Sequence, residues 1–300
     1  FKSGDLREDS GFYFSVGKFK CLLTVDANNL NFLRLPKVDL FASSFAGGAH
    51  GYPLNCENYE LKDRKKMIIM DKNFIKQTKF KYLEKIKPTY FLPYAGFFKE
   101  KLKRDEMYIK YNKKNETADY VSICEKYNIN LLDPEKENIF EFSNNKTFKA
   151  SKYSGKFFKD LSSDEYLKYF TNKYQKIDFD YIKKYFLNSN FHDESKLYIS
   201  LTNDEFKTLG LDFKVEFSKD IKFNIINENF QDFVNKDYNY LYLKIRKEAF
   251  LNTIYNRRSW EDISIGFQNR QFRNPNKYNS NFWHHFSNIY VSKKFVKSVT

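Results

Sequence analysis

The first 25 residues have the pattern of hydrophobic and polar positions that is typical of a β-hairpin. Phe12, Phe14 and Val16 alternate on one face, and the same period of two continues through residues 19–25. Gly17-Lys18 separates the two runs, and two residues is the commonest length for a hairpin turn. We therefore expect two adjacent antiparallel strands at this end of the chain.

A helical pattern follows, between two short apolar runs. Apolar residues recur at helix-like spacing over about residues 60–86, and Pro88 stops the pattern. The runs "KVDLFASSF" before it and "TYFLPYAGFF" after it each read as a buried strand that leads into a loop of small residues. Strand, helix and strand in this order favour a layered α/β body.

The pattern changes beyond about residue 145. A capping box, Ser162 with Glu165, opens the helical stretch "SSDEYLKYFTNKYQ". The segments "KLYISLT", "FKVEFS", "KFNII" and "YNYLYLKI" then predict successive strands of a sheet, and residues 246–268 return to helix. Strands followed by helices indicate a separate α+β module. We predict an α/β domain at 1–145 and a smaller α+β module at 146–300.

Composition narrows the class of protein. The net charge of +14 suggests a nucleic-acid-binding surface, yet lysines alternate with acidic residues along the chain, which favours a solvated basic surface that attracts anionic small molecules. No apolar run is long enough for a membrane span, so we expect no membrane partner. The three cysteines have no CxxC or CxH spacing, as in proteins of a reducing cytoplasm.

Glycine is rare here, with 10 residues in 300, yet Gly47, Gly48 and Gly51 all lie in "FAGGAHGYP". One reading is a turn that needs positive φ, and the other is a backbone that a ligand can approach because no Cβ blocks it. Composition alone does not separate the two. His50 in the same segment is a candidate ligand or base, although a lone loop histidine is more often neither.

Other candidate residues are carboxylates and arginines. Asp26 ends the strand "LLTVD", where it either binds a metal or caps the following loop. Arg270 and Arg273 are three apart, which we expect to place them on one face as a clamp for a phosphate or carboxylate, or as a plain surface pair. In "FWHHF" the buried-core interpretation, with Trp283 and Phe286 inside, is favoured over metal binding. The HxHxDH, GxSxG, GxxxxGK[ST] and GxGxxG signatures do not occur.

Several blocks of sequence, in order, resemble one known family. They are similar to the CMP-N-acetylneuraminate hydroxylases and to bacterial relatives that hydroxylate the N-acyl group of nucleotide-linked amino sugars. The match extends over about residues 9–286 and is poor at about 135–195. The blocks are "TVD…LPKVDLFASSFAGGAHGYP", "YFLPYAGFF", "DEMYIKYNKKN" and "SWEDISIGFQNRQFRNPNKY…FWHHF".

The resemblance implies a fold and cofactors. Residues 1–145 would form part of a metallo-β-lactamase αββα sandwich, with iron or zinc at its metal centre. The Rieske iron–sulfur cluster and the HxHxDH loop of this family would lie upstream of Phe1, so we expect a fragment that is inactive alone and that needs an electron-transfer partner at full length. Residues 240–267 also resemble a sterol-carrier-type module, which covers the cleft or mediates homodimer formation in some metallo-β-lactamase proteins.

The resemblance also assigns roles to residues. Asp26 matches the metal-bridging aspartate of metallo-β-lactamase folds. Asp5 falls where the family tends to carry a metal-binding histidine, so the centre is mononuclear, altered or lost. The remaining candidates would bind substrate: Gly47, Gly48, His50, Gly51, Tyr94, Gly96, Arg270 and Arg273.

We interpret the chain as part of an iron-dependent monooxygenase that hydroxylates the N-acyl group of a nucleotide-activated amino sugar, either CMP-sialic-acid-like or UDP-amino-sugar-like. One alternative is a metal-dependent hydrolase on the same fold, with a metal-bound hydroxide as nucleophile. Another is a basic module that binds nucleic acid or another protein. A Rieske motif in the upstream sequence would separate the first two.

Overall fold

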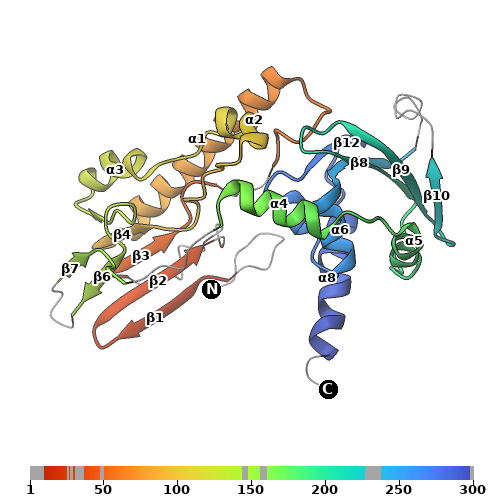
Figure 1. Cartoon of the computed structure of the whole chain (residues 1–300). Helices are drawn as coiled ribbons and strands as arrows, with labels where there is room; N and C mark the ends of the chain where they lie inside the picture. Colours follow the sequence, from red (N-terminus) through yellow and green to blue (C-terminus); the bar gives the residue numbers. More distant parts are fainter. Residues whose placement is uncertain are drawn as a thin grey trace. The chain divides into compact units, whose positions relative to one another are not determined.

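The structure is a computed structural model, and its chain divides into two compact units (Figure 1). Unit 1 contains residues 1–49, 66–99 and 112–159, and unit 2 contains residues 50–65, 100–111 and 160–300. The structure describes residues 10–25, 27, 30, 37–47, 51–143, 148–155, 161–226 and 238–297, with side chains to residue 290.

Unit 1 is built on a five-stranded sheet with the order β1-β2-β3-β4-β5. β1 and β2 form the expected antiparallel hairpin, in which Val16 pairs with Phe19 across the turn. β2, β3, β4 and β5 are parallel, so the loops that follow these strands leave the sheet at the same edge. The strands are β1 (Phe12–Val16), β2 (Phe19–Val25), β3 (Leu40–Ser43), β4 (Tyr90–Pro93) and β5 (Asn130–Leu131).

The two faces of this sheet carry different layers (Figure 1). Phe41 and Phe91 pack with the long helix α1 (Leu61–Ile86) and with α3 (Val121–Lys126), through side chains such as Leu83. Leu40 and Tyr90 point to the other face, where the small hairpin of β6 (Ile139–Phe142) and β7 (Phe148–Ser151) covers them. The fold is therefore a mixture of helices and sheets, as expected, whereas the αββα sandwich stays a prediction.

Unit 2 contains a second five-stranded sheet, with the order β10-β9-β8-β11-β12. β8 and β11 are parallel, and all other pairs are antiparallel. The four strands predicted from the sequence are confirmed as β8 to β11. The strands are β8 (Ser195–Thr202), β9 (Thr208–Phe217), β10 (Lys222–Ile226), β11 (Tyr240–Arg246) and β12 (Asn269–Asn274).

Helices cover one face of the unit 2 sheet and form an aromatic core. Trp260 is fully buried at its centre, and its indole Nε1 donates a hydrogen bond to the Tyr185 hydroxyl (2.8 Å). Trp283 and Phe286 are also buried, which confirms the core interpretation of "FWHHF". The helices are α5 (Phe179–Leu187), α6 (Lys247–Tyr255), α7 (Glu261–Ser264) and α8 (Ser280–Lys297).

Unit 2 contains two further helical segments. α4 (Ser163–Lys173) begins with the predicted capping box, in which Ser162 and Glu165 exchange hydrogen bonds. The short helices η2 (Lys103–Asp105) and α2 (Glu106–Tyr111) follow one another in the segment 100–111.

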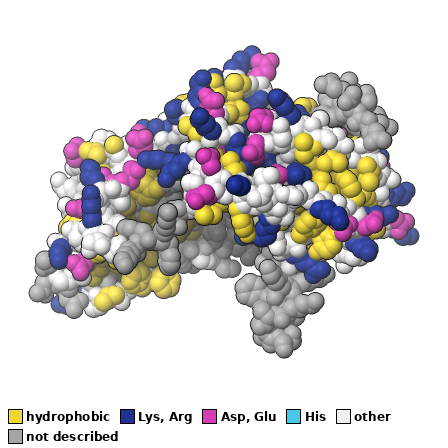
Figure 2. Space-filling view, in the orientation of Figure 1, with side chains coloured by type: hydrophobic (Ala, Val, Ile, Leu, Met, Phe, Trp, Pro, Cys, Tyr) yellow, Lys and Arg dark blue, Asp and Glu magenta, His cyan; other side chains and the backbone are white. Residues whose placement is uncertain are grey.

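The visible surface carries mixed charge. On the face drawn in Figure 2, Lys and Arg side chains alternate with Asp, Glu and hydrophobic side chains and form no continuous basic stripe. Within the described ranges, no helix has both the length and the apolar character that a membrane crossing requires.

Candidate functional site

Two of the predicted rim loops meet at the carboxyl edge of the unit 1 sheet. Gly47 follows β3 and Gly96 follows β4, with φ of +93° and +123° respectively, a region that L side chains rarely adopt. A Cβ on Gly96 would lie 2.8 Å from the Ala46 Cβ and 3.5 Å from the Gly47 carbonyl oxygen. The Tyr94 backbone N–H donates to the Ser43 carbonyl (3.1 Å). The structure thus brings Gly47, Tyr94 and Gly96 together, and both glycines satisfy a backbone requirement.

A buried lysine lies at the ends of the same strands. Lys79 of α1 is only 2% exposed, and its Nζ donates a hydrogen bond to the Ser43 Oγ (2.7 Å). The Thr24 hydroxyl donates to the same oxygen (2.8 Å). The next residue, Val25, has φ +39°, which is unusual for a β-branched residue. The sequence reasoning missed Lys79, although its position four before the buried Leu83 was a signal that it lies on the apolar helix face.

The metal-site prediction falls outside the described residues. This applies to Asp26 and Asp5, and also to the rim candidates Gly48 and His50. Among the residues that are described, no group of three His, Cys, Asp or Glu side chains could hold a metal ion. Ser43, Thr24 and the Lys79 ammonium group do not form a donor set for iron or zinc on their own. We therefore derive no chemical step through a metal.

The expectation that Arg270 and Arg273 share one face is wrong. Both lie in strand β12, where side chains alternate between faces, so residues three apart point to opposite sides. Arg273 is 7% exposed, and its Nε donates to the Asn276 Oδ1 (3.2 Å). Their roles in anion binding stay predictions, but the two guanidinium groups cannot form one clamp from one face of this strand.

Arg270 instead joins a buried tyrosine. Its Nη1 donates to the Tyr108 hydroxyl (2.9 Å), and its guanidinium lies 4.0 Å from the centroid of the Phe206 ring. Burial lowers the pKa of Arg270 and raises that of Tyr108. A Cβ on Gly51 would meet the same Tyr108 hydroxyl at 3.1 Å. Gly51 and Arg270 therefore surround one phenol within unit 2.

An ion-pair network ties the segment 100–111 to β11. Arg246, 1% exposed, binds the fully buried Asp105 through Nη2 and Oδ1 (2.8 Å). Its Nη2 also donates to the carbonyl oxygens of Arg104 (3.2 Å) and Asp204 (2.9 Å). The sequence did not single these residues out, because Arg246 lies 141 residues from Asp105 and 42 residues from Asp204, too far for a local pattern to show the pairing.

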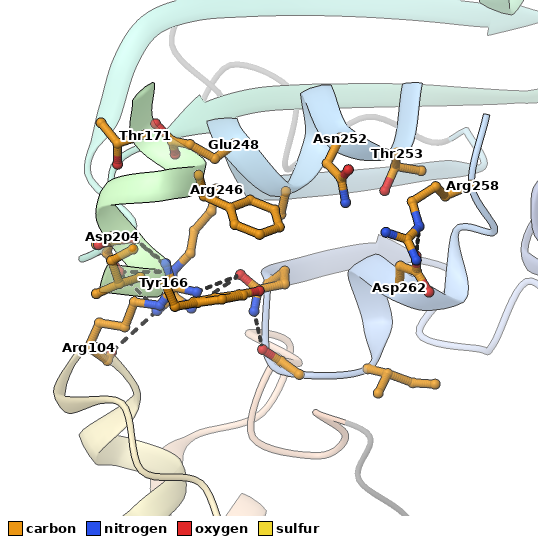
Figure 3. A pocket seen from close by; sticks show the side chains of 16 residues that line it. Arg104, Tyr166, Thr171, Asp204, Arg246, Glu248, Asn252, Thr253, Arg258 and Asp262 are labelled. Carbon is orange, nitrogen blue, oxygen red and sulfur yellow. Dashed lines mark hydrogen bonds and ion pairs between the residues drawn. The ribbon is translucent and has the colours of Figure 1, made fainter. Parts of the chain in front are cut away.

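Next to this network lies a pocket of about 300 Å³, entirely within unit 2 (Figure 3). One part of its wall is a face of α4, with Tyr166 and Phe170, and another part is a face of α6, with Asn252 and Thr253. Arg104 lies at one end of the pocket. Figure 3 shows the Asn252 and Thr253 side chains next to each other, with their polar ends turned towards the pocket. The pocket thus combines aromatic surface with hydrogen-bonding groups.

Comparison with known proteins gives one consistent result. The chain is 28% identical over 289 residues to "Cytidine monophosphate-N-acetylneuraminic acid hydroxylase" of Danio rerio, which covers 88% of this chain and 47% of that protein. The proteins of the same name from Sus scrofa and Mus musculus are each 26% identical over 89% of this chain, and over 64% and 48% of their own lengths.

The chain therefore spans only about half to two thirds of the length of these relatives. No protein-family profile matches it, and no solved structure matches significantly. The resemblance indicated by its motifs is confirmed: over almost nine tenths of its length, the chain is similar to the CMP-N-acetylneuraminic acid hydroxylases.

Proposed function

We propose that this chain forms part of a hydroxylase that acts on CMP-N-acetylneuraminic acid or a closely similar nucleotide-activated sugar. The observation that carries the proposal is the similarity to the named hydroxylases over 88–89% of the chain. A match of that extent includes residues of both units, because neither unit alone makes up so much of the chain. It is therefore stronger support than a single motif.

In this proposal the substrate binds at the carboxyl edge of the unit 1 sheet. Ligands of open sheets with parallel strands bind beyond the carboxyl ends of the strands, and Gly47 and Gly96 lie at that edge. In this proposal the half-buried backbone of these two loops contacts the substrate, and Tyr94 lies beside them. The net charge of +14 favours an anionic nucleotide sugar over a neutral one.

The proposed reaction inserts one oxygen atom into a C–H bond of the substrate's N-acyl group. One atom of O₂ enters the substrate and the other leaves as water, so an electron-transfer partner must supply two electrons while two protons are taken up. An iron centre with Asp26 as a ligand, together with an iron–sulfur cluster, would supply the oxygen and electron chemistry when bound. The contribution of this chain's described residues is to position the substrate.

The test uses the complete natural protein with O₂ and a reducing electron-transfer system. We expect CMP-N-acetylneuraminic acid to gain the mass of one oxygen atom, detected by mass spectrometry. Gly47→Val should weaken substrate binding at least tenfold, because a β-branched residue is strained at φ +93° and its side chain would crowd the Ile75 Cδ1, 3.0 Å from a Cβ at this position, so that the loop proposed to contact the substrate must shift. Absence of any oxygenated product, with electron delivery shown by consumption of the reductant, would contradict the proposal.

A further inference from the structure

The pocket of Figure 3 has balanced charge. Each arginine of its described wall already has a carboxylate partner, so an additional anionic group would gain little there. The acidic wall residue Glu248 is likewise paired with Lys247 (3.2 Å). The pocket therefore favours a neutral ligand. The three arginine pairs are Arg104–Asp204 (2.7 Å), Arg246–Asp105 (2.8 Å) and Arg258–Asp262 (2.8 Å).

The α6 wall presents a hydrogen-bond donor whose orientation is fixed. The Tyr174 hydroxyl donates to the Asn252 Oδ1 (2.6 Å), and the Asn256 Nδ2 donates to that Oδ1 (2.9 Å) and to the Tyr174 hydroxyl (2.8 Å). These bonds identify the oxygen of the Asn252 amide, so its nitrogen is the atom turned away from them. Figure 3 shows this nitrogen directed into the pocket. It is a positioned donor for a ligand acceptor.

The neighbouring Thr253 offers a second, independent sign of a ligand. Its side chain is 1% exposed and belongs to the pocket wall. The Oγ1 is buried and has no hydrogen-bond partner among the described residues. A buried hydroxyl without a partner costs about 1–3 kcal/mol, so native proteins normally satisfy it. A ligand that hydrogen-bonds at this wall would remove that cost.

The α4 wall adds a stacking surface. The rings of Tyr166 and Phe170 lie 4.8 Å apart between centroids, and Tyr166 remains 38% exposed although it is a large aromatic residue. Flat heterocycles stack on such rings with a gain of about 1–3 kcal/mol. A volume of about 300 Å³ is at the lower end for ligand pockets, which suits part of a nucleotide sugar rather than the whole.

We propose that this pocket of unit 2 binds a pyrimidine nucleoside of the kind that the nucleotide-activated sugar carries, an inference that rests on the proposed function. The base would stack on Tyr166, and its ring acceptors would receive hydrogen bonds from the Asn252 amide and the Thr253 hydroxyl. The acidic sugar fits less well, because its carboxylate would meet Asp204 and Glu248 without a spare cation. The charged groups of the wall also disfavour an apolar ligand.

Calorimetric titration of the full chain with cytidine tests this binding directly. We expect saturable binding of cytidine and of CMP, and none of free N-acetylneuraminic acid at the same concentration. Tyr166→Ala should weaken cytidine binding about tenfold, because the stacking surface is lost. Thr253→Val keeps the side-chain shape and removes only the hydroxyl, so we expect binding about three- to tenfold weaker with no loss of thermal stability.

The matched control is Tyr169→Ala. Tyr169 lies on the same helix and is 51% exposed, but it is not part of the pocket wall, so this variant should bind cytidine as the wild type does. Absence of cytidine binding by the wild type, or wild-type affinity for cytidine in both Tyr166→Ala and Thr253→Val, would overturn the inference. Binding without hydroxylation would leave this pocket assigned and contradict the proposed function. Hydroxylation with an unchanged KM in both variants would support the proposed function and contradict the assignment of this pocket.

Discussion

Even one added methyl group at position 96 should destabilise the fold. Gly96→Ala would place a Cβ 2.8 Å from that of Ala46 on a backbone with φ +123°. Overpacking and the strained backbone each cost about 1–3 kcal/mol, so we expect the free energy of unfolding to fall by roughly 2–6 kcal/mol. Denaturant titration of the variant and the wild type measures this difference.

The variant Gly210→Ala measures the cost of positive φ alone, without the cost of a close contact. Gly210 also has positive φ (+69°), but nothing lies within 4 Å of the position a Cβ would take. This variant should therefore lose only about 1 kcal/mol. Equal losses at positions 96 and 210 would show that the contact with Ala46 does not matter.

At the level of single residues, sequence reasoning identified only part of the candidate site. The scarcity of glycine pointed to Gly47, and the resemblance pointed to Gly96; the structure shows that each needs positive φ. Lys79 was missed, because lysines are so common in this chain that a buried one does not stand out. Its burial depends on Ser43, a partner 36 residues away that no local pattern reveals.

At the level of elements, the sequence predicted the helices and strands that depend on contacts between residues close together in the chain. The hairpin β1–β2, the helix α1 and the capping box of α4 all follow from periodicity and turn chemistry. Strand β12 shows where such signals fail. Its sequence, "NRQFRN", has a single apolar residue, and it is a strand because it pairs along β11. The wrong face assignment of Arg270 and Arg273 comes from this tertiary pairing.

The buried ion pair between Arg246 and Asp105 should stabilise segment 100–111, which it joins to β11. Arg246→Met leaves the Asp105 carboxylate buried without its closest cation, and we expect a loss of about 3–5 kcal/mol in the free energy of unfolding. Segment 100–111 should also become more sensitive to protease, because Arg246 binds it through both Asp105 and the Arg104 carbonyl oxygen. Limited proteolysis followed by mass spectrometry locates the cleavage.

The double variant Asp105→Asn with Arg246→Met supplies the control. It removes both charges, so no uncompensated carboxylate remains and part of the lost stability should return. If the double variant loses the sum of the two single losses, the two side chains do not interact as the structure indicates.

At the level of the whole molecule, buried acids predict a response to alkaline pH. Burial raises the pKa of the Cys124 thiol from 9.0 to about 12, and that of the Tyr242 phenol from 10.0 to about 12. The folded state therefore holds these protons after the unfolded state has lost them. These groups make their full contribution to the free energy of unfolding below their unfolded pKa values. The contribution falls as pH rises above about 9, by about 1.4 kcal/mol per pH unit for each group.

Denaturant midpoints measured from about pH 8 to about pH 11 test this response. Cys124→Ala removes one of the three buried thiols, which titrate before the tyrosines in the unfolded state. Its stability should consequently decline less steeply than that of the wild type between about pH 9 and about pH 10. Parallel curves for the two proteins would mean that burial of this thiol has no effect on the alkaline response.

The division of the chain into two units has a consequence for its synthesis. Unit 2 combines segments 50–65 and 100–111 with residues 160–300, and Gln271 of β12 exchanges backbone hydrogen bonds with Asn55 and Glu57. A ribosome releases these two early segments long before β12 exists. Both segments therefore stay without these strand partners while residues 112–268 are translated, and we expect chaperones that bind nascent chains to bind there.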